Sequence, residues 1–216
     1  MNIGRIPYLS CEPFYFEIER RGMALYDMVP SALADAVAKG EIDAGPVSLV
    51  DCFRLADHCR FLSGFCVATI RKAGSVLLHS KQPIQTLSGA RIGISSEAVT
   101  SFRLLQVLLA LKYQVQPAAY VTLADAHDAF LLMGNAGLRH RVDMDRKEEV
   151  MLEDALYVGM QDWADGLFHP RSSRDDVLMH PRDILEYTQG IRYFIGVPEQ
   201  RAIDRFRQYL DQLNIQ

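Results

Sequence analysis

Apolar residues in the first seventy positions occur in short runs that alternate with segments of helical spacing. Strands are predicted at residues 3–6, 25–29, 42–47 and 61–70. Helices are predicted between them, at residues 12–21, 30–38 and 48–54. Pro13 is tolerated in the first turn of the first helix. This alternation indicates a layered α/β protein with a mostly parallel sheet.

The same pattern begins again after residue 74, which indicates a second lobe. Further strands are predicted at residues 75–79, 91–94, 118–121 and 129–133. Helices are predicted at residues 100–112 and 199–213, with residues 187–193 at a helix end and mainly helical sequence from residue 148. We therefore expect one lobe from residues 1–72 with 148–216, and a second lobe from residues 73–147.

Composition narrows the classes of partner. The 216 residues carry 23 Lys and Arg and 27 Asp and Glu, a net charge of −4, with the arginines scattered. A nucleic-acid partner is therefore not expected. No apolar run is long enough to cross a bilayer, and no signal-peptide pattern precedes the first strand. We expect a cytoplasmic protein with a small-molecule partner, either a monomer or a homodimer.

The four cysteines do not form a convincing metal site. Cys52, Cys59 and Cys66 are evenly spaced and His58 lies beside them, but a Ser-Gly pair at residues 63–64 interrupts any common helix. No CxxC pair is present, and the fourth cysteine, Cys11, stands alone. We expect buried, reduced thiols and no metal.

A polar loop between a strand and a helix occurs twice, at residues 3–13 and 90–101. Each begins with an apolar run, passes through hydroxyl residues and then enters helical spacing. Unpaired backbone amides at a helix start bind anions. One such loop in each half predicts a cleft that closes on a small acidic molecule.

Several short motifs in this order resemble the menaquinone-biosynthesis family of periplasmic-binding-protein-like enzymes. The motifs are RIPYLSCEPF at 5–14, GEIDAGPVS at 40–48, GSVLLHSK at 74–81 and ISSEAVTS at 94–101. Residues 185–206 are similar to the C-terminal helices of that family, so the resemblance covers most of residues 1–139 and 150–213. Within the family, the resemblance is to chorismate dehydratases of the futalosine pathway.

The resemblance implies a type II periplasmic-binding-protein-like fold. Two α/β lobes would be joined by two crossing segments, with a substrate cleft at the strand ends. The implied reaction is loss of water from chorismate, a dicarboxylate, to give 3-[(1-carboxyvinyl)oxy]benzoate without metal or organic cofactor. Such a site must accept one proton, assist the leaving hydroxyl and hold two carboxylates.

The resemblance, together with positions at strand ends and at a helix start, assigns roles to individual residues. Ser75 and Ser10 would lie around the reacting ring. Substrate binding would fall to Arg5, Tyr8, Ser48, Ser96, Thr100, Ser101 and Asn135.

Most of these side chains also have an ordinary structural interpretation. Arg5 could form an ion pair with Glu12 or Asp27, and Ser48 could only cap a helix. A backbone carbonyl could satisfy the hydroxyl of Ser75. The hydroxyls at residues 95–101 exceed what N-capping needs, which favours anion binding there. His79 lies in a predicted strand, where a structural role is favoured over a general base.

Departures from the family pattern concern the same regions. Ser10 stands where relatives usually have Asn. Residues 133–138 correspond to a stretch where relatives have Ile-Gly-Asp-x-Ala-Leu. Asn135 replaces the aspartate and removes its carboxylate, and Gly137 is expected to loosen the helix start. The second crossing strand is expected to be absent, with a deletion near Asp145 and Arg146 that shortens the second lobe.

Two alternatives to the dehydratase follow. One is a non-catalytic cytoplasmic protein of the same fold that binds a small carboxylate, which Ser10, Asn135 and the missing strand favour. The other is the sister enzyme that acts on a later futalosine-derived intermediate, for which a histidine aimed into the cleft would be expected.

Overall fold

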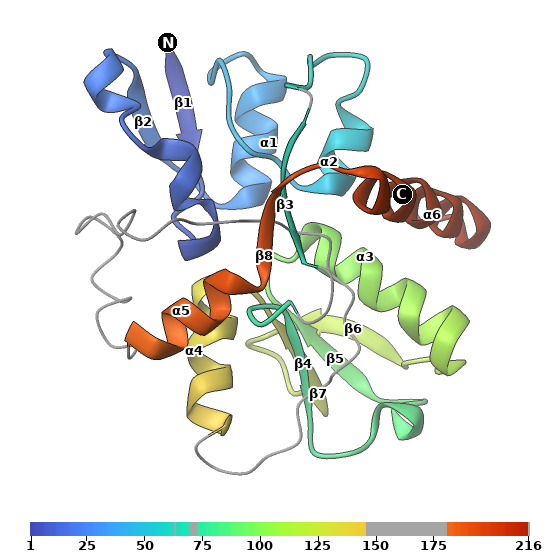
Figure 1. Ribbon diagram of the computed structural model, residues 1–216. Helices are drawn as coiled ribbons and strands as arrows, with labels where there is room; N and C mark the ends of the chain where they lie inside the picture. Colours follow the sequence, from blue (N-terminus) through green and yellow to red (C-terminus); the bar gives the residue numbers. More distant parts are fainter. Residues whose placement is uncertain (63, 70–72, 146–180, 216) are drawn as a thin grey trace. The chain divides into compact units, whose positions relative to one another are not determined.

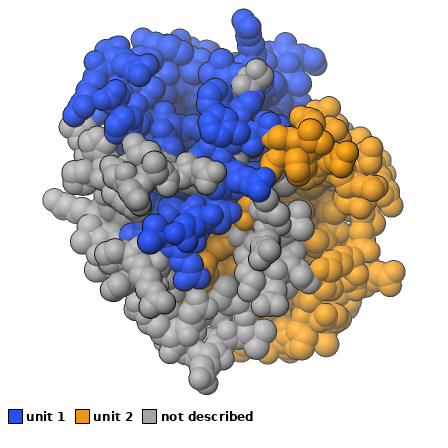
Figure 2. All heavy atoms as spheres, in the orientation of Figure 1, with its two compact units in different colours: residues 1–68, 159–195 blue, residues 69–158, 196–216 orange. Residues whose placement is uncertain are grey.

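The computed structural model describes residues 1–62, 64–69, 73–145 and 181–215. The chain divides into two compact units, residues 1–68 with 159–195 and residues 69–158 with 196–216, which Figure 2 colours separately. Each unit has its own strands and helices.

The first unit begins with a parallel pair of strands, β1 (Asn2–Arg5) and β2 (Ala24–Asp27). Helix α1 (Pro30–Ala38) follows β2 and lies beside the pair (Figure 1). The chain then returns to the free edge of β1, where the amide of Gly4 donates to the carbonyl of Ala44 at 2.8 Å. The strand predicted at residues 42–47 is therefore wrong in length, since only this one bridge forms.

Close packing of α1 on β1 explains two glycines. Leu33 of α1 is completely buried, and a Cβ at Gly45 would lie 3.2 Å from its side chain. A Cβ at Gly4 would overlap the same leucine. The residues at the centre of this core are Ile3, Ile6, Cys11, Tyr15 and Leu33. At Gly4 the buried leucine lies flat on the strand and leaves no room for a side chain, whereas at Gly45 a Cβ would lie closest to the backbone oxygen of Gly4, at 3.0 Å.

The helix predicted at residues 12–21 is wrong. The structure has two short 3₁₀ segments instead, η1 (Leu9–Tyr15) and η2 (Glu19–Arg21). Pro13 lies inside η1 and supplies no amide donor, and Glu17 has a φ of 57°, which an α-helix cannot accommodate. The segment is therefore a series of tight turns. Helix α2 (Leu49–Arg54) then begins after Ser48, as predicted.

A strand missed by the sequence analysis, β8 (Ile191–Phe194), pairs with β3 (Phe65–Thr69). It follows helix α5 (Pro181–Gln189), and its residues are alternately buried and exposed. The chain passes from the first unit to the second after residues 68 and 195, next to these two strands. The second crossing strand that was expected to be absent would follow residue 145, and that part of the chain lies outside the described residues.

The second unit contains a four-stranded sheet of order β4-β7-β5-β6. Its strands are β4 (Leu77–Ser80), β5 (Arg91–Ile94), β6 (Ala119–Thr122) and β7 (Ala129–Leu132). β5 is parallel to both β6 and β7, whereas β4 is antiparallel to β7. The predicted mostly parallel sheet is confirmed, although β4 begins two residues later than expected.

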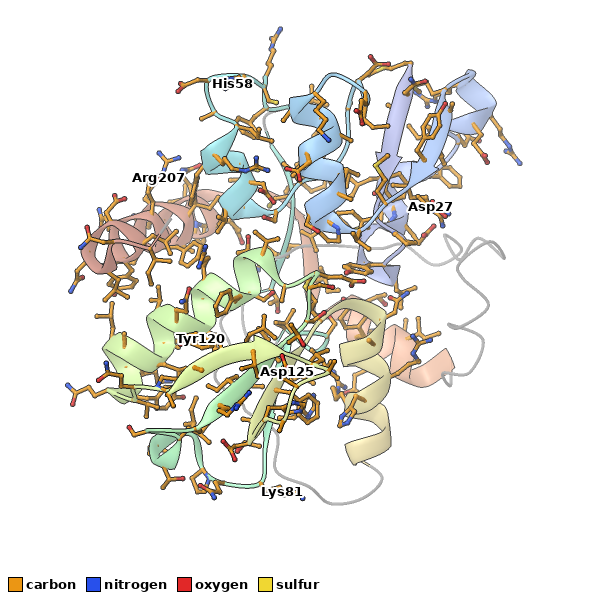
Figure 3. The ribbon with its side chains drawn as sticks, turned by 180° about the vertical axis from the view of Figure 1, so that it is seen from behind. Asp27, His58, Lys81, Tyr120, Asp125 and Arg207 are labelled. Carbon is orange, nitrogen blue, oxygen red and sulfur yellow. The ribbon has the colours of Figure 1, made fainter. Side chains whose placement is uncertain are left out.

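A short connection, residues 123–128, joins β6 to β7 and crosses β5. β6 and β7 lie on opposite sides of β5, so residues 123–128 must pass over one of its faces. Figure 3 shows Tyr120 on β6 and Asp125 in the turn after it. The Asp125 carboxylate accepts from the amide and hydroxyl of Thr122, at 3.1 and 2.9 Å.

Gly93 makes that passage possible. A Cβ on Gly93 would lie 3.1 Å from the His127 ring and 3.3 Å from Leu123. Both side chains belong to the crossing segment, so a larger residue in β5 would push it away from the sheet.

The helices of the second unit are η3 (Ile84–Thr86), α3 (Val99–Val107), α4 (Gly134–Asp145) and α6 (Val197–Leu213). The helix predicted at residues 100–112 is α-helical only in α3 and continues as a π-helical segment, η4 (Leu108–Tyr113). Helix α6 packs against α3 and belongs to this unit, whereas the sequence analysis placed it in the first lobe. The helices expected from residue 148 to 180 and the junction at residues 145–146 lie outside the described residues.

Candidate functional site

In the first unit, the candidate loop is the turn that links β1 to η1. The amide of Ile6 donates to the Tyr15 hydroxyl at 2.9 Å, and the amide of Cys11 donates to the carbonyl of Tyr8 at 2.8 Å. Ser10 is 8% exposed, with its hydroxyl oxygen 3.9 Å from the Cys11 sulfur. Tyr8 is half-buried at the start of η1. The loop is thus ordered by its own backbone and by a buried tyrosine.

Arg5 ends β1 and forms the ion pairs that its structural interpretation predicted. Its Nη2 lies 2.5 Å from Glu12 Oε1, and its Nη1 lies 3.3 Å from Asp27 Oδ1 (Figure 3 labels Asp27). Burial alone would lower its pKa, but the two carboxylates outweigh burial and raise the pKa above its ordinary value. Two guanidinium nitrogens are therefore already paired, with Glu12 and Asp27, which favours a structural role. The third nitrogen, Nε, is buried and makes no hydrogen bond to any residue that the structure describes.

Ser48 caps α2, as its alternative interpretation predicted. Its hydroxyl accepts from the Asp51 amide at 3.2 Å and donates to the Asp51 carboxylate at 2.8 Å. Arg54 also contacts that carboxylate, at 2.9 Å. The hydroxyl of Ser48 is therefore committed to the helix start.

In the second unit, the remaining candidates gather at one edge of the sheet. Parallel β5 and β7 both end there, and antiparallel β4 begins there, with Leu77 opposite Leu132. The amide of Ser95 donates to the carbonyl of Leu131 at 3.3 Å, which joins the ends of β5 and β7. The starts of α3 and α4 and the residue Ser75 therefore lie at this same edge, where open α/β sheets bind ligands.

The start of α3 has the features of an anion site. No described side chain caps this helix, whose N-cap residue is Ala98. Thr100 is 7% exposed and Ser101 is 3% exposed, whereas Ser96 lies on the surface. The Ser101 hydroxyl is buried and makes no hydrogen bond to any residue that the structure describes. Because buried hydroxyls are rarely left unpaired, this one is a candidate donor to a ligand.

The start of α4 lies against the backbone of Ser75. Asn135 is 9% exposed in the first turn, after Gly134 with a φ of 64°. A Cβ on Gly137 would overlap the carbonyl oxygen of Ser75. Gly137 was expected to loosen this helix start, but the structure shows a close contact that only glycine allows.

The Ser75 hydroxyl already has a backbone partner. It is buried and donates to the carbonyl of Ala73 at 3.2 Å. A hydroxyl oxygen can still accept a hydrogen bond while it donates one. The Ser75 hydroxyl oxygen can therefore accept a hydrogen bond from a ligand, while its own proton is directed at the Ala73 carbonyl.

The buried histidine of β4 is structural. The His79 ring stacks on Phe130 at 4.9 Å and lies 4.2 Å from the His140 ring. Burial, with a smaller contribution from His140, lowers the pKa of His79 to about 4. His79 is neutral near pH 7 and packs in the core, as the sequence analysis favoured.

Two residues that sequence reasoning missed support the first loop. Tyr15 is described above, and Tyr193 of β8 donates its hydroxyl to the carbonyl of Ser10 at 2.6 Å. In a 3₁₀ turn the Ser10 carbonyl would accept from the amide of residue 13, but Pro13 has no amide hydrogen. This proline is the only local sign that the Ser10 carbonyl needs a donor from elsewhere.

Two of the thiols, those of Cys11 and Cys52, resist ionisation because they are buried. Burial raises the pKa of Cys11 to about 12 and that of Cys52 to about 11. Among the described residues, no group of three or more His, Cys, Asp or Glu side chains is arranged to hold a metal ion. In the same part of the chain, no helix is long and apolar enough to span a bilayer.

A family model described as menaquinone biosynthesis matches residues 1–153 of this chain. That span includes the loop at Ser10, the start of α3 and the start of α4. The match thus covers every residue proposed for the site.

Solved structures share the fold at low sequence identity. Protein AF1704 from Archaeoglobus fulgidus is 12% identical with a TM-score of 0.70, covering 100% of this chain and 98% of that one. The periplasmic aliphatic sulphonate binding protein SsuA from Escherichia coli is 14% identical with a TM-score of 0.57, covering 100% and 87%. The fold is therefore the α/β, type II periplasmic-binding-protein-like fold, as predicted.

Proposed function

The chain belongs to the menaquinone biosynthesis family, and we propose that it is a chorismate dehydratase. The reaction removes water from chorismate to give 3-[(1-carboxyvinyl)oxy]benzoate. The ring loses a proton from the carbon that bears the enolpyruvyl ether and a hydroxide from the neighbouring carbon. Aromatisation of the ring supplies the driving force, so the protein needs mainly to position the substrate.

The observation that carries this proposal is the unpaired Ser101 hydroxyl at the start of α3. With the positive end of the helix dipole and the buried Thr100 beside it, the start of α3 suits a carboxylate. Chorismate has two carboxylates. We assign one of them to Ser96, Thr100 and Ser101, and we expect Asn135 to contribute at the neighbouring helix start.

The proposed chemistry does not depend on a protein base. His79 is buried and stacked on Phe130, which leaves it unsuited to proton removal. We propose that a carboxylate of the substrate accepts the ring proton. We propose the hydroxyls of Ser10 and Ser75 as the groups that act in catalysis, with Ser75, whose own proton is directed at Ala73, as an acceptor.

The direct test incubates the purified protein with chorismate and follows product by ultraviolet absorbance and chromatography. Conversion by the wild-type chain and weaker binding of chorismate by Ser101→Ala would support the proposal. A methyl ester of chorismate that binds normally and turns over as fast as chorismate would contradict the role of the substrate carboxylate.

A second candidate is a protein of this fold that binds a small carboxylate without catalysis. The observation that favours it is the prior engagement of Ser75 by the Ala73 carbonyl. Chorismate would then raise the melting temperature without any product being formed. The two functions are separated by measuring both quantities on one sample.

A further inference from the structure

The carbonyl of Ser10 occupies an unusual position in its backbone. In a 3₁₀ segment, the carbonyl of each residue accepts from the amide three residues later. For Ser10 that residue is Pro13, which lies inside η1 and has no amide hydrogen. The 3₁₀ pattern therefore leaves this carbonyl without its regular donor.

A tyrosine hydroxyl from the far end of the chain supplies the missing donor. The Tyr193 hydroxyl donates to the Ser10 carbonyl at 2.6 Å, from a residue 183 positions away. Both residues are buried, with Tyr193 6% exposed and Ser10 8% exposed. A buried carbonyl that lost this bond would be left unsatisfied by its own segment.

The ring of Tyr193 is also fixed in place. It meets the Phe14 ring edge-on, with centroids 5.2 Å apart and planes at 82°. Tyr193 lies in β8, where alternate residues point into the unit, and β8 is paired with β3. The hydroxyl is thus held by packing at one end and by the Ser10 carbonyl at the other.

We propose that Tyr193 is a positioning residue for the loop that bears Ser10. Its hydroxyl replaces the amide that Pro13 lacks, and so it fixes the peptide plane at Ser10 and the direction of the Ser10 hydroxyl. This inference rests on the proposed function for its catalytic consequence. Its structural part stands on the hydrogen bond and the proline alone.

The test compares Tyr193→Phe with wild type. Phenylalanine keeps the ring contact with Phe14 and removes only the hydroxyl. We expect amide hydrogen exchange in residues 9–12 to accelerate about tenfold, because local opening becomes easier. We also expect kcat for chorismate to fall about tenfold with KM nearly unchanged, since misplacement of a reacting group affects the chemical step.

A second substitution provides the rescue. Pro13→Ala restores an amide at the position that the 3₁₀ pattern directs at Ser10. The double variant Tyr193→Phe with Pro13→Ala should regain most of the lost protection and most of the lost kcat. Tyr209→Phe on α6, where the ring stacks under Arg205, removes a tyrosine hydroxyl elsewhere and should leave both quantities unchanged.

The exchange, kcat and rescue measurements each test whether Tyr193 positions the loop. Unchanged exchange in residues 9–12 of Tyr193→Phe overturns it, as does faster exchange with unchanged kcat. Failure of the Pro13→Ala rescue overturns the donor-replacement argument. If wild type converts no chorismate, the proposed function fails, whereas the exchange and rescue measurements still decide whether Tyr193 holds the loop.

Discussion

Gly137 faces the carbonyl oxygen of Ser75 so closely that a single Cβ would overlap it. This contact fixes the first turn of α4 on the segment that precedes β4. Two candidate residues distant in sequence, Ser75 and Asn135, are thereby held at one edge of the sheet.

Gly137→Ala should therefore displace α4 from Ser75. We expect a destabilisation of about 1–3 kcal/mol, as for overpacked sites, and at least a tenfold loss of chorismate turnover. Urea denaturation and steady-state kinetics measure the two effects. Gly190→Ala, whose Cβ would lie an ordinary 3.5 Å from the Tyr187 carbonyl, is the matched control and should change neither by much. A Gly137→Ala variant with full stability and activity would refute the close contact.

Ser101→Ala should separate stability from binding. Removing a buried hydroxyl that makes no protein hydrogen bond in the described chain should leave the free energy of unfolding unchanged or raise it by up to about 1 kcal/mol. Chorismate affinity should fall about tenfold if the hydroxyl contacts a carboxylate, which corresponds to about 1.4 kcal/mol. Thermal melts and calorimetric titration measure these quantities. A large loss of stability with unchanged affinity would identify Ser101 as purely structural.

Protonation of His79 should weaken the fold in mildly acidic solution. Its pKa is about 4 in the folded protein against an ordinary 6.5, so the unfolded chain binds the proton more readily. The corresponding stability is fully present above pH 6.5 and is lost as the pH falls toward 4. By pH 4 the loss amounts to about 3 kcal/mol, since the pKa differs by about 2.5 and one pKa unit corresponds to about 1.4 kcal/mol.

The measurement is the free energy of unfolding at several pH values between 4 and 7. His79→Phe keeps an aromatic ring against Phe130 and should flatten that part of the pH dependence. Equal slopes for wild type and the variant would show that another group titrates there.

Gly93→Ala should strain the crossing from β6 to β7. The new Cβ would lie 3.1 Å from the His127 ring, and we expect a loss of about 1–2 kcal/mol in unfolding free energy. Adding His127→Ala removes the obstructing ring, so the double variant should lose less than the sum of the two single changes. Strict additivity of the two losses would contradict the contact.

Glu12→Gln should decide the role of Arg5. Breaking the 2.5 Å ion pair should cost about 1–2 kcal/mol of stability, because the pair is largely shielded from solvent. If Arg5 is structural, chorismate affinity stays the same. Tighter binding in Glu12→Gln would instead mean that the released guanidinium holds a substrate carboxylate.

The sequence correctly predicted the helices and strands whose first and last residues are marked by neighbouring residues in the chain. Helix α1 at Pro30–Ala38 and strand β5 at Arg91–Ile94 have the predicted bounds, because a proline start and a short apolar run are visible in the sequence. Strand β8 was missed because its partner β3 is more than a hundred residues away in sequence. Strands stabilised by distant pairing carry a weak local pattern.

In the candidate site, too, features that depend on neighbouring residues could be predicted, and contacts between distant residues could not. The cap at Ser48 and the hydroxyls at the start of α3 were recognised because they depend on neighbouring residues. The contact of Gly137 with Ser75 and the bond from Tyr193 to Ser10 depend on the folded chain. The charge partners of Arg5 were named in advance, but their simultaneous use by one guanidinium required the structure.

The bond between Tyr193 and Ser10 also has a consequence for biosynthesis. Ser10 is synthesised 183 residues before Tyr193. The loop can therefore form this hydrogen bond only after β8 has been synthesised. Nascent chains that stop before β8 lack the hydrogen bond from Tyr193 to Ser10. Premature termination therefore yields a protein whose first unit is incompletely folded.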